Sequence, residues 1–131
     1  MAERANEAVV REIFGAFARK EGFALRGRFA EDAVWSVPGH GIMAGTYRGR
    51  DEIFRFLARL PKETDGTYAS ELVDVLASDT RAAALYRARG TRGGRTLELD
   101  QVLLFTFEDG RITRVLALPS DPVAFEEFWA P

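Results

Sequence analysis

Residues 86–112 read YRARGTRGGRTLELDQVLLFTFEDGRI, and this stretch decides the fold. Two turn signals of two residues each, Gly93-Gly94 and Asp109-Gly110, separate runs of residues in which apolar and polar side chains alternate. A looser turn is expected at Ser78-Asp79. The pattern therefore predicts four consecutive antiparallel strands, at about residues 67–77, 80–92, 95–108 and 111–118.

The segment before this meander has a helical pattern. Apolar residues recur at helical spacing from Val9 to Phe17, Gly22 interrupts them, and Pro61 is expected to stop a later helix. The predicted elements are helices around 9–17, 23–29, 51–60 and 122–129, and short strands at 33–37 and 46–48. Helices followed by a meander predict one α+β domain over residues 1–131, a curved antiparallel sheet with helices packed on one face.

The glycine turns also predict the strand register. Across Gly93-Gly94, paired residue numbers add up to 187, so Tyr86 faces Gln101 and two Arg–acid pairs fall opposite each other. Across Asp109-Gly110 the sum is 219. The inner face is then predicted to carry Ala82, Ala84, Tyr86, Leu97, Leu99, Gln101, Leu103, Phe105, Phe107, Ile112, Arg114, Leu116 and Leu118. A two-residue turn at Ser78-Asp79 adds Glu71 to this face, and a three-residue turn adds Asp74 instead.

The back face of the same strands is expected to carry an apolar patch made of Val102, Leu104, Val115 and Ala117. A patch of this kind on an exposed sheet face is typical of a subunit interface. The sequence therefore predicts a homodimer that forms through the back of the sheet.

Composition excludes several classes of function. The chain has 131 residues and no Cys, which excludes disulfides, thiol nucleophiles and thiolate metal sites. A net charge of −2 and the single His argue against a nucleic-acid partner and against a metal centre, and no cofactor motif is present. Apolar runs are far shorter than a membrane span, and the first residues do not resemble a signal peptide. We therefore expect a cytoplasmic protein without a cofactor or a membrane partner.

Gln101 and Tyr86 are the polar residues of interest on the predicted inner face. A buried amide must find partners. Either the two side chains orient a small apolar ligand in a cavity, or each bonds to nearby protein groups. His40, between Gly39 and Gly41, is either a general base or an exposed loop residue. Glu71 is the other candidate base. The residues predicted to contact a ligand are Trp35, Tyr47, Tyr86, Gln101, Leu103 and Leu118.

Three segments carry a family resemblance: FAEDAVW at 29–35, GTYRGRD at 45–51 and FEDGRI at 107–112. With the order of elements, they resemble the SnoaL-like branch of the nuclear transport factor 2-like superfamily. The resemblance implies a cystatin-like α+β barrel, a cone whose curved sheet wraps around a pocket, and frequent homodimers. Members include polyketide cyclases, ketosteroid isomerases, epoxide hydrolases, dehydratases and non-catalytic domains.

The catalytic residues that the resemblance implies are not matched in this chain. The isomerases place an Asp before the Pro of the first strand, where this chain has Val37, and a second Asp near Leu103. The hydrolases and cyclases use an acid on the last strand, and here none occurs before Asp121. Two functions stay open: a cofactor-free enzyme that transfers a proton next to a carbonyl group, as in isomerisation, cyclisation or dehydration, and a non-catalytic domain that binds ligands or dimerises.

Overall fold

The computed structural model describes residues 2–131. The elements follow one another as α1 (Ala2–Ala18), the 3-10 helix η1 (Gly22–Arg28), β1 (Phe29–Val37), β2 (Gly45–Arg48), α2 (Gly49–Glu63), β3 (Ala69–Ala77), β4 (Arg81–Arg92), β5 (Arg95–Glu108), β6 (Arg111–Pro119) and α3 (Pro122–Trp129). The predicted α+β class is confirmed.

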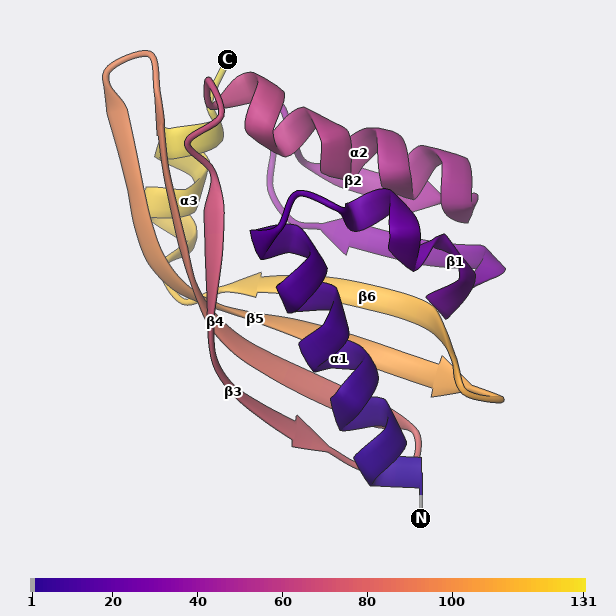
Figure 1. Cartoon of the computed structure of the whole chain (residues 1–131). Helices are drawn as coiled ribbons and strands as arrows, with labels where there is room; N and C mark the ends of the chain where they lie inside the picture. The colour runs from indigo at the N-terminus through magenta and orange to yellow at the C-terminus, as the bar shows by residue number, and fades with distance from the viewer. Residues whose placement is uncertain (1) are drawn as a thin grey trace.

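The strands form one curved, unclosed sheet in the order β2-β1-β6-β5-β4-β3. Figure 1 shows α1 and α2 over the same face of this sheet, and α3 near the end at which the β4–β5 hairpin projects. β1 lies parallel to β6, so the expectation of a purely antiparallel sheet is wrong at this one pair. A parallel pair needs a long crossover, and the chain supplies it through β2, α2 and the other meander strands.

α1 packs its apolar side on the sheet because its buried residues recur at helical spacing: Val9, Val10, Ile13, Phe14 and Ala16. One polar residue is buried with them. Asn6 is only 2% exposed, and its amide donates hydrogen bonds to the carbonyls of Ser78 and Asp79, both at 3.0 Å. This pair of bonds ties the first turns of α1 to the β3–β4 turn.

α2 continues past Pro61 and ends at Glu63, so the expected stop at the proline is wrong. The turn after the proline is held by Thr64, whose hydroxyl donates to the Leu60 carbonyl at 2.7 Å. Thr64 is fully buried, and its hydroxyl also accepts the backbone N–H of Tyr68 at 3.1 Å. None of the helices within residues 2–131 is long and apolar enough to span a membrane.

Candidate functional site

The concave face of the sheet and the helices above it enclose a cavity of about 670 Å³. This volume lies within the range of about 300–1,000 Å³ that is typical of small-molecule sites. Exposed lining residues come from the end of α1, from η1, from α2 and from the segment before β3, so the cavity opens to solvent between these elements. Its deep end is formed by buried side chains of the sheet: Trp35, Val37, Tyr86, Gln101, Leu103 and Ala117.

The predicted β4–β5 register explains why two polar side chains lie at this deep end. Tyr86 is paired with Gln101, as the Gly93-Gly94 turn predicts, and both point to the concave face. Gln101 Nε2 donates to the Tyr86 hydroxyl at 2.7 Å. Trp35 and Leu103 also line the cavity, so the structure places four of the predicted ligand contacts together.

A β-bulge at Thr113 changes the register of β6. The pairing sum is 219 next to the Asp109-Gly110 turn, as predicted, but it becomes 220 from Thr106 onward. An extra residue reverses which side chains point inward beyond the bulge. Ala117 therefore lines the cavity, whereas Leu118 is 42% exposed on the back face, and its predicted place in the cavity is wrong. The same shift turns Arg114 and Leu116 outward and Val115 inward.

A second bulge, at Val73, changes β3 in the same way. Leu72 pairs with Tyr86 and Asp74 pairs with Leu85, so Val73 is the extra residue. Glu71 therefore lies on the back face, exposed, with its carboxylate 3.8 Å from the Arg89 guanidinium. Its expected place in the cavity is wrong, and Asp74 is exposed as well.

The Val73 bulge also brings a residue into the cavity that the sequence did not predict. Tyr68 lines the cavity together with Ser70, because both share the inward side of β3 with Leu72. In a strand without the bulge, side chains would alternate regularly from the inward-facing Val75, and Tyr68 would point outward. The only signal in the sequence is the change from even to odd apolar positions between Leu72 and Val75, and the apolar Val73 hides it.

Gln101 donates to Tyr86 at the deep end, and the Tyr68 hydroxyl lies next to the hydroxyls of Tyr86 and Ser70. Burial raises the pKa of the Tyr86 hydroxyl well above its usual value, and the neighbouring Tyr68 raises this pKa further. The hydrogen bond from Gln101 lowers the pKa, but by less. Burial also raises the pKa of Tyr68, and its bonds to Ser70 and Tyr86 lower it in part. Both hydroxyls are therefore neutral donors at physiological pH.

Two polar atoms of the deep end are buried without a hydrogen-bond partner: the Gln101 carbonyl oxygen, Oε1, and the Trp35 indole nitrogen, Nε1. Gln101 is 5% exposed and Trp35 is 3% exposed. A buried polar atom without a partner costs about 1–3 kcal/mol of stability, and such atoms are rare in folded proteins.

His40 lies outside the cavity, on the exposed loop between β1 and β2. Its backbone N–H donates to the Glu126 carboxylate, at 2.9 Å to Oε2, so this loop holds α3. Gly41 is needed there, because a Cβ would come within 2.7 Å of the Trp129 backbone oxygen. The His40 side chain is not part of the cavity lining, so the hypothesis that it is a general base of this cavity is wrong.

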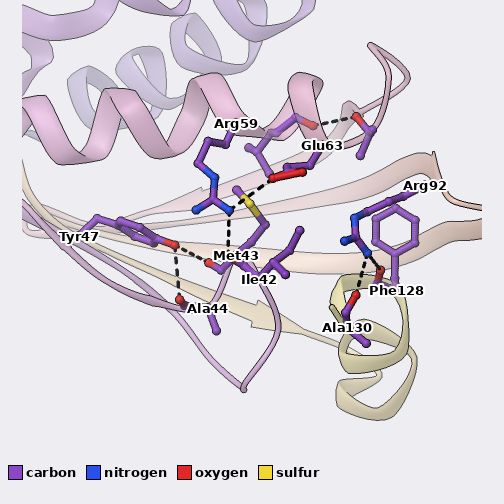
Figure 2. Close-up of polar contacts among 11 residues, drawn as sticks. Ile42, Met43, Ala44, Tyr47, Arg59, Glu63, Arg92, Phe128 and Ala130 are labelled. Atoms are coloured by element: carbon purple, nitrogen blue, oxygen red, sulfur yellow. Dashed lines mark hydrogen bonds and ion pairs between the residues drawn. The ribbon is translucent and has the colours of Figure 1, made fainter.

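Tyr47 also lies outside the lining, so its predicted ligand contact is not supported by its position. Its ring stacks on Phe56 with centroids 4.4 Å apart, and its hydroxyl donates to the Met43 carbonyl at 2.7 Å. Figure 2 shows this bond beside the one from Arg59 to the Ile42 carbonyl at 3.1 Å. Tyr47 and Arg59 thus fasten the loop that carries Met43 into the cavity wall.

The opposite end of the cavity wall is closed by α3. Arg92 donates to the carbonyls of Phe128, at 3.3 Å, and Ala130, at 2.8 Å (Figure 2). Arg95 reaches the same Ala130 carbonyl at 2.6 Å. Two guanidinium groups at the C-terminal end of a helix stabilise its unpaired carbonyls. They keep Phe125 and Trp129 in the lining.

The lining has no carboxylate and no imidazole, and its single charged residue is Lys20 at the exposed mouth. Among residues 2–131, no group of three or more His, Asp or Glu side chains is placed to hold a metal ion. The chemistry available at the deep end is therefore that of neutral hydrogen-bond donors and acceptors within an apolar wall.

These features define the class of protein. The chain belongs to the SnoaL-like domain family, whose pattern matches residues 10–115, and the resemblance seen in the sequence is confirmed. An uncharacterized protein of Mycobacterium tuberculosis is 39% identical to it over 99% of this chain and 100% of its own length.

Solved structures agree with this assignment. Bal32a, from a soil-derived mobile gene cassette, has a TM-score of 0.94 at 33% identity and covers 98% of this chain and 99% of its own. TerC, co-crystallized with polyporic acid, has a TM-score of 0.81 at 25% identity and covers 95% of this chain and 97% of its own. Structures assigned to the SnoaL-like polyketide cyclases and to the ketosteroid isomerases share the fold at 15% and 21% identity, which shows the fold alone.

Proposed function

We propose that this protein binds a compact, largely apolar carbonyl compound in the cavity between the sheet and the helices. The observation that carries the proposal is an apolar cavity of about 670 Å³ with a few polar groups gathered at its deep end. Sites for small molecules combine an apolar wall with a few placed polar groups in this way. The structure of TerC, which is 25% identical to this chain and was co-crystallized with polyporic acid, supports the proposal that this fold takes up a small organic molecule.

The neutral fluorescent compound N-phenylnaphthylamine tests whether the cavity takes up apolar molecules. We expect saturable binding of one molecule per chain with a rise in fluorescence. Ala117→Phe places a ring in the cavity and should weaken binding at least tenfold, because Ala117 belongs to the lining. Ala83→Phe is the matched control, since Ala83 lies in the same sheet, on β4, and faces the back of the sheet. Equal binding by both variants would refute the proposal.

A second candidate function is catalysis of proton transfer next to the carbonyl group, and the hydroxyl-bearing side chain of Tyr68 in the cavity lining favours it. A neutral hydroxyl at 2.7–3.1 Å from a ketone oxygen stabilises the enolate that forms when the α-hydrogen leaves as a proton. In this scheme water or hydroxide removes the proton, because the lining supplies no carboxylate or imidazole. Tyr68 is the candidate donor to the oxygen.

Exchange of the α-hydrogens of tetralone in D₂O, followed by proton NMR, separates the two functions. A catalyst accelerates exchange above the buffer rate, and Tyr68→Phe slows it while N-phenylnaphthylamine still binds. A binding protein leaves exchange at the buffer rate although tetralone occupies the cavity.

A further inference from the structure

We infer that the deep end of the cavity selects an uncharged ligand that offers a hydrogen-bond acceptor to Trp35 Nε1 and a hydrogen-bond donor to Gln101 Oε1. This inference rests on the proposed function and adds to it the polar pattern of the ligand. It follows from two side chains of one cavity lining whose buried polar atoms, of opposite hydrogen-bonding character, have no partner in the protein.

The Gln101 amide is oriented with its nitrogen toward Tyr86, which leaves the carbonyl oxygen for a ligand. Nε2 donates to the Tyr86 hydroxyl at 2.7 Å. The neighbouring Tyr68 can accept the hydrogen of the Tyr86 hydroxyl, so Tyr86 is able to accept from Gln101. Oε1 can only accept, and it is buried without a partner. A ligand hydroxyl or N–H that reaches Oε1 would give this carbonyl oxygen a hydrogen-bond partner.

The indole of Trp35 supplies the complementary atom. Its ring lies between Phe29 and Phe56, with centroids 6.4 and 5.7 Å away, so aromatic contacts hold its position. Nε1 can only donate, and it too is buried without a partner. A ligand carbonyl or ether oxygen would give this N–H the partner that the protein does not supply.

The charge of the ligand follows from the same lining. The sheet side chains at the deep end are uncharged, and the one charged lining residue, Lys20, is exposed at the mouth. A carboxylate or ammonium group buried among them would lack a counter-ion and would pay a large desolvation cost. Hydroxy ketones and hydroxylated aromatic carbonyl compounds satisfy all three conditions.

Four kinds of compound on one bicyclic skeleton test the inference. They are the positional isomers of hydroxytetralone, tetralone, which lacks the hydroxyl, tetrahydronaphthol, which lacks the carbonyl, and tetralin, which lacks both groups. Binding is measured by isothermal titration calorimetry near neutral pH. We expect the best hydroxytetralone isomer to bind about tenfold more tightly than either singly substituted compound, since each buried hydrogen bond that replaces an unpaired atom has an effect of this order.

Two protein variants then assign each ligand group to its partner. In Gln101→Met, the gain from the ligand hydroxyl should fall below about twofold, while the gain from the carbonyl persists. In Trp35→Phe, the gain from the carbonyl should be lost and that from the hydroxyl should persist. The affinity of the same variant for tetralin is the internal reference, because any general damage to the cavity weakens tetralin binding as well.

The outcomes separate this inference from the proposed function. If tetralin binds as tightly as every hydroxytetralone isomer, the inference is overturned and the proposed function stands. The inference is also overturned if both variants lose both gains equally. If neither the four compounds nor N-phenylnaphthylamine bind, both the inference and the proposed function fail.

Discussion

The buried pair Tyr86 and Gln101 gives the sharpest test of the structure, because two substitutions that remove the same hydrogen bond should change stability by very different amounts. Tyr86→Phe removes the hydroxyl that accepts from Gln101 Nε2 at 2.7 Å. The amide is then buried with its N–H and its C=O both unpaired, since Oε1 has no partner in the native protein. The expected loss of unfolding free energy is about 1–3 kcal/mol.

Gln101→Met also removes this hydrogen bond, yet it should cost far less. Methionine has nearly the same length and shape, and the substitution removes the unpaired carbonyl together with the amide. The Tyr86 hydroxyl keeps Tyr68 as a polar neighbour. We expect a change within about 1 kcal/mol of the native protein, in either direction, because a polar group without a partner is replaced by an apolar one.

Urea unfolding followed by far-UV circular dichroism measures both values and their coupling. Leu103→Met is the matched control, since Leu103 lies two residues away on the same strand face and the exchange keeps its volume. In the double variant, Tyr86→Phe should cost less than it does alone, with a coupling of about 1–2 kcal/mol. A Gln101→Met variant that is less stable than Tyr86→Phe by 2 kcal/mol or more, or strict additivity of the two, would refute the assignment of Oε1 as unpaired.

Three further predictions test other parts of the structure. Burial raises the pKa of all three tyrosines, so near-UV titration of the native protein should show phenolate formation above pH 10, and unfolding in urea should return it to about pH 10. The unfolded chain then releases these protons first, so the stability that the tyrosines contribute should be constant below about pH 10 and fall as the pH rises further; a native titration at the ordinary pKa contradicts this. Gly41→Ala should cost about 1–3 kcal/mol by forcing α3 away from the loop, whereas Gly27→Ala, with no atom within 4 Å of the added Cβ, should change stability by less than about 0.5 kcal/mol in urea unfolding. The homodimer through the back of the sheet stays a prediction: Leu118→Glu should convert it to a monomer in sedimentation without unfolding it, because Leu118 is 42% exposed on that face, and an unchanged dimer would remove the interface from this surface.

Much of the fold is predictable from the sequence because its turns are chemically explicit. Gly93 and Gly94 have φ of 53° and 82°, the left-handed conformation that a tight hairpin requires and that glycine adopts without strain. That turn alone fixes the register of β4 and β5 along its whole length. The pairing of Tyr86 with Gln101, which is the centre of the site, therefore follows from counting residues.

The errors in the predicted site come from two bulges and from one loop. Period-two counting assumes that every residue of a strand has a partner, and neither Val73 nor Thr113 differs in composition from an ordinary strand residue. Beyond each bulge, in β3 and in β6, the side chains that counting predicts to point inward point outward, and the reverse. The role of the loop around His40 depends on its contact with α3, which is 86 residues away along the chain and leaves no local signal.

The bulge at Val73 also decides which chemistry the cavity offers. In a regular β3, the pairing of Val75 with Ala84 would continue along the strand, so Glu71 would lie opposite Ala88 on the inner side and supply a carboxylate base. The extra residue moves Glu71 to the back face beside Arg89 and leaves Tyr68 and Ser70 in the lining. A strand distortion that curves the sheet around the cavity thus exchanges a charged group for two hydroxyls. This exchange favours the binding of a neutral molecule, because a buried carboxylate would have required either a cation or a raised pKa. The same exchange would deprive a catalyst that depends on a carboxylate of its base.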